Sequence, residues 1–149
     1  MELNLPKYNL KTQNTAGKAM VFDSFRKKYV ALTPEEYVRQ HFALYLVNEK
    51  KYPKSLTAIE HSLKFYGMDR RADIVIYNPE GDVILITECK APSVKITQKA
   101  FDQIARYNMQ FKSKYLAVSN GLKHYCCEFT GKGTYRFLKD IPEYKAINQ

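Results

Sequence analysis

Two apolar segments joined by a five-residue turn constrain the fold of this chain more than any other feature. Residues 72–77 (ADIVIY) and 83–89 (VILITEC) are nearly continuous apolar runs that are rich in β-branched residues. The intervening segment, residues 78–82 (NPEGD), has the composition of a turn, and it makes the two runs antiparallel neighbours in a hairpin. Because neither run alternates with polar residues, we expect both in the middle of a sheet that is covered on its two faces.

A helix start precedes this hairpin in the chain. Thr33 takes the N-cap position, Pro34 takes the first helical position, and Glu36 closes a capping box. The helix is expected to run to about Lys50, because the Tyr52-Pro53 pair that follows ends it.

A second amphipathic helix is predicted over residues 97–112, with Ala100, Ile104, Tyr107 and Phe111 on its buried stripe. Shorter segments have strand character, and these are residues 19–23, 28–32, 56–65, 115–119, 124–129 and 135–138. The sequence therefore predicts an α/β (α+β) fold, in which a central mixed β-sheet is flanked by helices on both faces.

Length and composition favour a single domain over residues 1–149, which is enough chain for one core. Residues 1–18 are polar and aperiodic, so we expect an extended N-terminal arm ahead of a core at about residues 19–140. The three cysteines have neither disulfide nor metal-site spacing, which fits a cytoplasmic setting. No signal peptide and no apolar run of membrane-spanning length is found, so no membrane association is expected.

The formal net charge of +9 favours an anionic partner, with nucleic acid ahead of an anionic membrane surface. Surplus lysine also serves solubility alone. The charge therefore becomes informative only beside a site that has chemistry of its own.

The predicted hairpin brings two acids to the same end of the sheet. Its turn places Asp73 opposite Thr87 or Glu88, and opposed residues in a sheet lie about 5 Å apart. Glu88 and Lys90 are two residues apart, so they project from the same face. Two acids at the edge of an apolar hairpin require a positive charge between them, and a magnesium ion suits such oxygen ligands.

Simpler interpretations of the same residues stay open at this point. Asp73 can pair with Arg70 or Arg71, and Glu88 with Lys90, as ordinary ion pairs that contribute little. Helix capping alone explains Glu36 as well as a metal site does.

The spacing of Asp73 and Glu88-Cys89-Lys90 resembles the signature of the PD-(D/E)XK nuclease superfamily, with Arg71-Ala72-Asp73 in place of the usual Pro-Asp pair. Four blocks in the same order resemble the N-terminal nuclease domain of the type I restriction enzyme R subunit. They are residues 32–40 (LTPEEYVRQ), 71–76 (RADIVI), 88–92 (ECKAP) and 103–108 (QIARYN), and the likeness extends over roughly residues 20–130.

This resemblance implies a restriction-endonuclease-like core that hydrolyses DNA phosphodiester bonds with Mg²⁺, for which Mn²⁺ is expected to substitute. Asp73, Glu88 and the backbone carbonyl of Cys89 would hold the metal, and Lys90 would be the catalytic lysine.

The resemblance also implies roles for residues of the two helices. Gln103 and Tyr107 match a Gln-x-x-x-Tyr motif that supports the site or the DNA backbone, and the first-helix acid would be Glu36, with Glu35 as the alternative. The cationic and aromatic residues expected to bind DNA are Arg70, Arg71, Lys95, Lys99, Arg106 and Tyr107.

Three hypotheses of function follow. The first is a DNA endonuclease that works with separately encoded restriction-modification subunits. The second is a nucleic-acid-binding or assembly module that retains the nuclease fold without cutting. The third is a homodimeric nuclease, because two active sites are needed to cut both strands.

Overall fold

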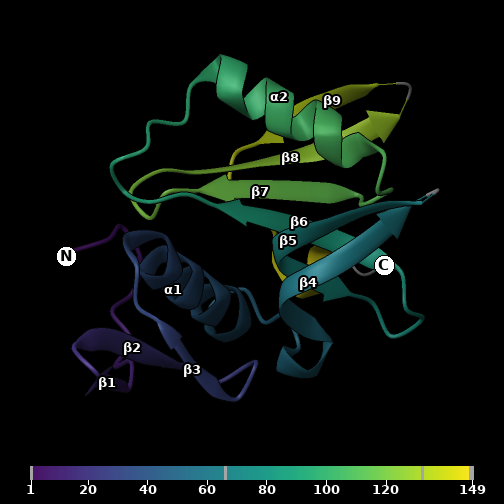
Figure 1. Cartoon of the computed structure of the whole chain (residues 1–149). Coiled ribbons are helices and arrows are strands. Elements are labelled where there is room, and N and C mark those ends of the chain that lie inside the picture. The colour runs from purple at the N-terminus through teal and green to yellow at the C-terminus, as the bar shows by residue number, and fades with distance from the viewer. Residues whose placement is uncertain (1, 66, 132, 148–149) are drawn as a thin grey trace.

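A computed structural model describes residues 2–65, 67–131 and 133–147 of the chain as a three-stranded sheet, a six-stranded sheet and their flanking helices (Figure 1). None of the helices within these residues has the length and apolar character needed to cross a membrane. The elements in chain order are β1 (Thr12–Thr15), β2 (Lys18–Asp23), β3 (Lys28–Ala31), α1 (Pro34–Asn48), the 3-10 helix η1 (Lys54–Leu56), β4 (Thr57–Phe65), β5 (Met68–Tyr77), β6 (Val83–Cys89), α2 (Gln98–Met109), β7 (Tyr115–Ser119), β8 (His124–Gly131), β9 (Thr134–Leu138) and α3 (Tyr144–Ile147).

The large sheet has the strand order β4-β5-β6-β7-β8-β9 and is mixed. Strands β6 and β7 are parallel, whereas the other neighbouring pairs are antiparallel. A parallel pair needs a crossover connection, and α2 supplies it between β6 and β7. Helix α1 covers one face of the sheet and α2 covers the other, so the predicted fold class is confirmed.

Helix α1 packs against the large sheet through one apolar face. Val38, Phe42 and Leu46 have no exposed surface, and they belong to one buried cluster with Ile74 and Leu85 of the central strands. Burying a side chain of this size contributes roughly 1.5–3 kcal/mol to stability, so this face fixes α1 against β5 and β6.

The predicted buried face of α2 is wrong by one residue. Phe101, Ala105 and Asn108 are its buried residues, while Tyr107 is 44% exposed; Phe111, just beyond the helix, is buried as predicted. Phe101 determines this rotation, because its ring packs against three aromatic residues of β8 and β9. The ring centroids lie 6.3 Å from Tyr125, 5.7 Å from Tyr135 and 4.8 Å from Phe137.

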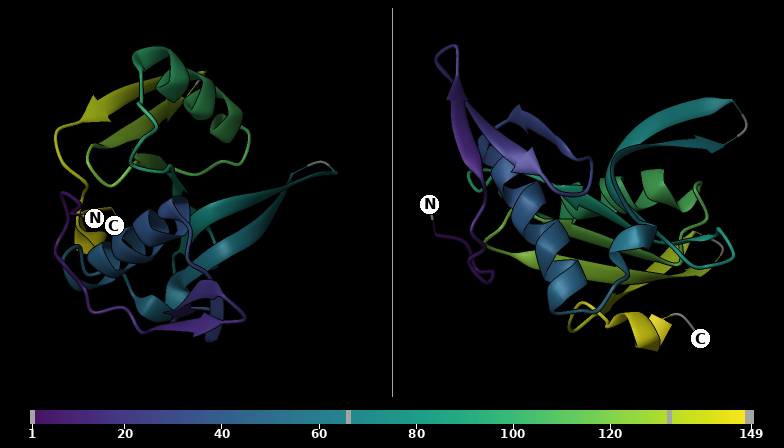
Figure 2. Two further views of the ribbon diagram at one scale, coloured as in Figure 1. Left: turned by 60° about the vertical axis from the view of Figure 1, so that its left-hand side comes forward. Right: turned by 90° about the horizontal axis from the view of Figure 1, so that it is seen from below.

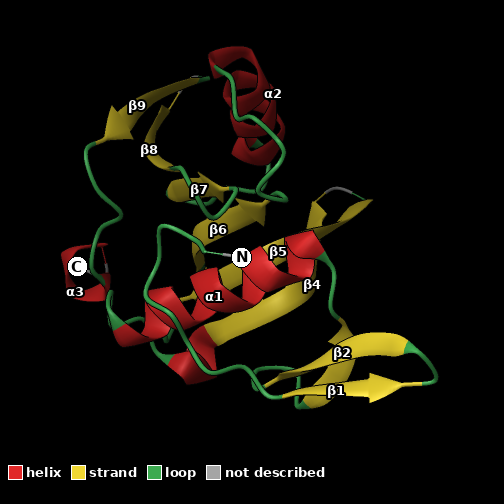
Figure 3. Cartoon of the chain, turned by 90° about the vertical axis from the view of Figure 1, so that its left-hand side faces the viewer, coloured by secondary structure: helices red, strands yellow, loops and turns green. Residues whose placement is uncertain are grey.

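The N-terminal arm contains a strand that the sequence did not indicate. The predicted hairpin of β2 and β3 is present, but residues 12–15 add β1 to its other edge. A two-residue turn makes this possible, because Ala16 and Gly17 both have positive φ angles, of 53° and 80°. The resulting small sheet lies beside α1 (Figure 3).

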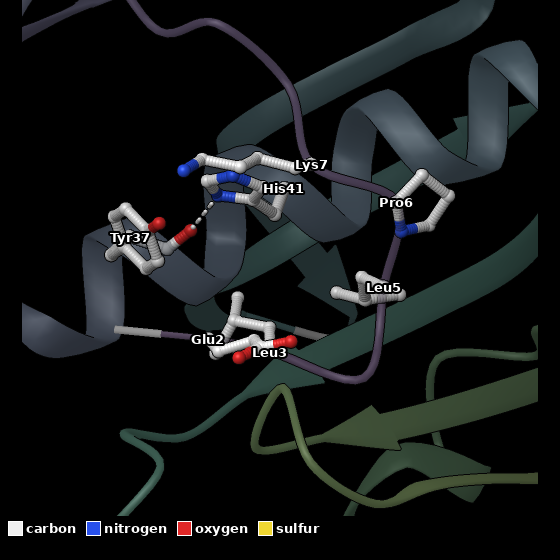
Figure 4. Close-up of a pocket in the computed structure, with 7 residues that line it drawn as sticks. All are labelled: Glu2, Leu3, Leu5, Pro6, Lys7, Tyr37 and His41. Atoms are coloured by element: carbon white, nitrogen blue, oxygen red, sulfur yellow. Dashed lines mark hydrogen bonds between the residues drawn. The ribbon is translucent and has the colours of Figure 1, made fainter.

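Residues ahead of β1 cross the outside of α1 and reach the turn between β7 and β8. The Asn4 N–H donates to the Gly121 carbonyl at 2.8 Å, and His124 Nε2 lies 2.8 Å from the Asn4 carbonyl oxygen. A cavity of about 490 Å³ lies between this segment and α1 (Figure 4). The residues that line it are Glu2, Leu3, Leu5, Pro6, Lys7, Tyr37 and His41.

Candidate active site

The register of the β5–β6 hairpin sets the position of the two predicted acids. Ile74 pairs with Thr87 and Tyr77 pairs with Val83, with a bulge between Ile76 and Tyr77 that shifts the register. The next position beyond the Ile74–Thr87 pair joins residues 73 and 88. Asp73 and Glu88 therefore lie on adjacent strands at one end of the hairpin.

Both oxygens of the buried Asp73 carboxylate have hydrogen-bond partners. Oδ1 accepts from Arg39 Nη2 at 2.9 Å, and Oδ2 accepts from the backbone N–H of Cys89 at 2.7 Å. The side chain of Asp73 thus joins the first helix to the end of β6. Burial, followed by the charge of Asp73, raises the pKa of the Cys89 thiol well above its ordinary value.

Glu88 is held by an arginine from the neighbouring strand. Arg70 Nη2 donates to Glu88 Oε1, and Arg70 Nη1 donates to Asn108 Oδ1 at 2.6 Å. The same guanidinium lies 5.2 Å from the ring centroid of Tyr107 and 5.5 Å from that of Phe111. These contacts from α2 and its C-terminal turn restrict the orientation of Arg70.

The ionised form of Glu88 is disfavoured in spite of this arginine. Burial is the largest cause, and together with the charge of Asp73 it raises the pKa of Glu88 to about 7. Arg70 and Lys90 act in the opposite direction and limit the rise. Glu88 is therefore a carboxyl group that further positive charge would keep ionised.

Arg39 is the centre of an ion network that the sequence did not predict. Its Nη1 lies 2.5 Å from Glu36 Oε1, and its Nη2 lies 3.0 Å from Glu60 Oε1 and 3.4 Å from Glu35 Oε1, in addition to its bond to Asp73. Burial would lower the pKa of Arg39, but Asp73 and Glu36 outweigh it and raise the pKa. Nη2 carries two protons for three carboxylates, so this arginine leaves part of the local negative charge unmatched.

The Glu36 carboxylate belongs to this network. The Thr33 hydroxyl accepts from the Glu36 N–H at 3.0 Å, as the predicted N-cap requires. The Glu36 side chain accepts from Arg26 Nη2 at 3.1 Å and from Gln40 Nε2 at 2.9 Å, besides its bond to Arg39. Helix capping therefore accounts for the backbone of Glu36 but leaves its buried charge to the arginines.

Glu60 joins the network from strained backbone. Its φ of 52° lies in the left-handed region, which a non-glycine residue adopts inside a strand only when its surroundings enforce it. Its carboxylate lies 3.0 Å from Arg39 and 3.7 Å from Arg71. In the β4–β5 register, Glu60 lies opposite Asp73. The strained backbone at Glu60 therefore occurs where its carboxylate lies close to Asp73.

A cavity of about 400 Å³ opens on the α2 side of this centre. Its lining combines residues of β5, β6 and α2, which are Arg70, Arg71, Glu88, Gln103, Ile104, Tyr107 and Asn108. Five of the predicted site residues therefore come together at one cavity.

Other predicted residues lie elsewhere. Lys95, Lys99 and Arg106 are exposed and are not among the residues that line this cavity. Arg106 Nε pairs with Asp102 Oδ2 at 2.9 Å. Lys90 is half-buried at the end of β6, and its N–H donates to the Ser119 carbonyl at 2.8 Å.

The donor chemistry suits a magnesium ion, although no group of three or more His, Cys, Asp or Glu side chains within the described ranges is arranged to hold a metal. Magnesium is usually bound through one or two carboxylates, with waters and substrate phosphate completing its shell. The network also has excess negative charge, with five carboxylates (Asp23, Glu35, Glu36, Glu60, Asp73) against three guanidinium groups (Arg26, Arg39, Arg71). Arg70 occupies Oε1 of Glu88, so an ion at this residue would share the carboxylate with Arg70 and bind through Oε2.

The sequence missed the partners of both acids. Asp73 pairs with Arg39 rather than with Arg70 or Arg71, and Glu88 pairs with Arg70 rather than with Lys90. Arg39 follows Glu36 by three residues on a helix, and this spacing indicates a local ion pair. Nothing in the spacing indicates that the same guanidinium reaches a strand 34 residues further along the chain.

Comparison with known proteins identifies the family. Residues 34–142 match the family described as type I restriction enzyme R protein N terminus (HSDR_N). The chain belongs to this family. A search of curated proteins gave no match.

Two solved structures resemble this HSDR_N chain. One is a fragment described as an HsdR subunit of a type I restriction enzyme from Vibrio vulnificus YJ016, with a TM-score of 0.58 and 16% sequence identity. The likeness covers 78% of this chain and 24% of that one, so this chain spans about a quarter of its relative's length. The other is described as a nuclease of the DUF820 group from Anabaena variabilis, with a TM-score of 0.47 and 10% identity over 91% of this chain and 80% of that one.

Proposed function

We propose that this HSDR_N chain is a nuclease domain that hydrolyses DNA phosphodiester bonds with Mg²⁺, and that Mn²⁺ substitutes for it. The observation that carries the proposal is the register of β5 and β6, which puts Asp73 and Glu88 side by side just before Lys90. Family membership gives this arrangement its chemical meaning. The proposed setting is the cytoplasm, with separately encoded restriction-modification subunits as partners.

Asp73, Glu88 and the Cys89 carbonyl would hold the cation. When bound, it would supply positive charge to the scissile phosphate and a more acidic water molecule. Lys90, whose charge already lowers the pKa of Glu88, would stabilise negative charge that develops on the phosphate. Arg70, which lines the adjacent cavity, would offer its guanidinium to a phosphate oxygen.

Residues of the cavity that is lined by β5, β6 and α2 would position the DNA backbone. Arg71 is exposed at the cavity and Tyr107 is 44% exposed, so both are accessible to a substrate. Gln103 lines the same cavity from α2. Lys95, Lys99 and Arg106, which lie outside the cavity lining, would add charge at a distance from the reacting phosphate.

Cleavage of supercoiled plasmid DNA in Mg²⁺ tests this function. Asp73→Asn and Lys90→Met should each lower the cleavage rate by about 10²-fold or more, because each removes a group that acts on the reacting phosphate or its metal. Lys145→Gln removes an exposed charge on α3 and serves as the matched control, which should cleave as the wild type does. Wild-type rates in both site variants, with far-ultraviolet circular dichroism showing intact folds, would exclude the assignment.

A second candidate function is a DNA-binding or assembly module that keeps the nuclease fold. The pairing of both acids with arginines favours it, because Asp73 and Glu88 already have countercharges without a metal. DNA binding without cutting, in both Mg²⁺ and Mn²⁺ and with plasmid, linear and branched substrates, would decide for the module.

A further inference from the structure

The small sheet of β1, β2 and β3 has one buried face and one open face. On β2, Val21 and Asp23 have no exposed surface, whereas Lys18 is exposed and Phe22 is partly exposed. Side chains alternate between the faces of a strand, so Lys18 and Phe22 belong to the open face. Tyr29 of β3 pairs with Phe22 and therefore lies on this face too.

A row of side chains crosses the open face. Lys11 Nζ lies 5.9 Å from the ring centroid of Phe22, and the Phe22 and Tyr29 rings meet edge to face with centroids 5.3 Å apart. Lys18 lies near one end of the sheet, and Lys27 and Lys28 lie at the turn between β2 and β3. The open face therefore presents cationic groups around an aromatic pair.

Positive charge is concentrated in this part of the chain. Residues 11–31 contain five basic residues and one acid, Asp23, which is buried and paired with Arg26. Within the described residues, none of the ion pairs involves Lys11, Lys18, Lys27 or Lys28. These four lysines are exposed, so their charge faces the solvent.

The sheet is attached to the candidate active site through ion pairs. Arg26, in the turn between β2 and β3, lies 2.5 Å from Asp23 and 3.1 Å from Glu36. Glu36 binds Arg39, and Arg39 binds Asp73. The sheet and the β4–β5 hairpin both project beyond the start of α1, on the side away from α3 (Figures 2 and 3).

We infer that the open face of the β1–β3 sheet is a second contact surface for the phosphate backbone of duplex DNA, formed by Lys11 and Lys18, with Lys27 and Lys28 adding positive charge at the edge where β2 turns into β3. The identity of the polymer rests on the proposed function, while the surface rests on the charge and exposure of these residues. The ion pairs of Arg26 fix the sheet to α1, so the position of this surface is fixed relative to the Asp73 network. Contacts of this kind hold the backbone without reading its sequence.

Binding of a labelled DNA duplex in metal-free buffer, followed by fluorescence anisotropy over a range of salt concentrations, tests the surface. The double variant Lys11→Gln/Lys18→Gln should bind about tenfold more weakly at low salt. Its salt slope should fall by about 0.9 for each phosphate that the variant no longer neutralises. The matched control is Lys139→Gln/Lys145→Gln, which removes the same charge from exposed positions near α3.

The control variant should keep the wild-type affinity and salt slope. Equally weakened binding in the two double variants would overturn the surface, because net charge alone would then explain the result. Wild-type affinity in the Lys11/Lys18 variant, or no duplex binding by the wild type, would also overturn it.

Plasmid cleavage, measured separately, distinguishes this inference from the proposed function. A wild-type chain that binds DNA through Lys11 and Lys18 without cutting supports the surface and contradicts the nuclease. Cutting by a chain whose DNA binding does not depend on Lys11 and Lys18 supports the nuclease and contradicts the surface.

Discussion

At the scale of single residues, Glu88 carries the largest electrostatic consequence for function. It lies between Arg70, which neutralises it, and Asp73, which repels it, in a position where water screens neither charge well. Burial and the charge of Asp73 raise the pKa of this carboxyl to about 7, so it is close to half-protonation at neutral pH. A cation favours the ionised form, so metal binding and proton release at Glu88 should be coupled.

Thermal unfolding as a function of pH tests this coupling. The pKa of Glu88 rises from an ordinary value of 4.5 to about 7 on folding, so between these values the native state binds more protons than the unfolded state. Stability therefore falls as pH rises through this window. The melting temperature of the wild type, taken relative to that of Glu88→Gln, should drop between about pH 5 and about pH 8.

Magnesium provides the second arm of this test. It should raise the wild-type melting temperature more at about pH 8 than at about pH 5, because only the ionised carboxyl binds the metal. Parallel pH profiles for the wild type and Glu88→Gln would contradict the raised pKa.

At the scale of elements, Arg39 makes α1 more than a cover for the sheet. Its guanidinium contacts carboxylates of α1, β4 and β5, so one side chain joins three elements around the predicted metal ligand Asp73. Buried charges of this kind become costly when one partner is removed, because the remaining ions lose their compensation.

Arg39→Met should therefore lower the free energy of unfolding by about 3–5 kcal/mol, as measured by urea denaturation. Glu35→Gln is the matched control, because the Glu35 side chain is 48% exposed. Its carboxylate lies 3.4 Å from Arg39 Nη2, which is farther than Asp73 or Glu60 lies from the same atom. That exposed pair should contribute less than about 1 kcal/mol. Similar destabilisation in the two variants would show that Arg39 does not stabilise the junction through Asp73, Glu36 and Glu60.

The elements also show where sequence-based prediction succeeds. The start of α1 and the β5–β6 hairpin were predicted correctly because their signals are local, in the Thr33-Pro34 cap and the turn at residues 78–82. The buried face of α2 was not, because Phe101 packs on aromatic residues of β8 and β9 that approach only in the folded chain. The ion-pair partners of Asp73 and Glu88 were not predicted for the same reason. Several arginines are available to each acid, and only the folded structure determines which of them is close enough.

At the scale of the whole molecule, the turn between β7 and β8 joins the N-terminal segment to the rest of the fold. The Gly121 carbonyl accepts a hydrogen bond from the Asn4 N–H. The α-carbon of Gly121 faces Leu3 of the N-terminal segment and Val38 of α1. Its φ is 86°, so glycine suits the backbone as well as the space. Gly121 thus lies where the N-terminal segment, the first helix and the large sheet meet.

Replacing this glycine separates the packing effect from the backbone effect. A Cβ at Gly121 would lie 2.8 Å from Leu3 Cδ2 and 3.1 Å from Val38 Cγ2, whereas a Cβ at Gly17 would meet nothing within 4 Å. Both residues have a positive φ, 86° at Gly121 and 80° at Gly17, so alanine strains the backbone at either one. Gly121→Ala should therefore lower the free energy of unfolding by about 1–3 kcal/mol more than Gly17→Ala does, because only there must Leu3 and Val38 move. Equal destabilisation in urea denaturation would show that the N-terminal segment yields freely and that its contacts with the sheet do not stabilise the fold.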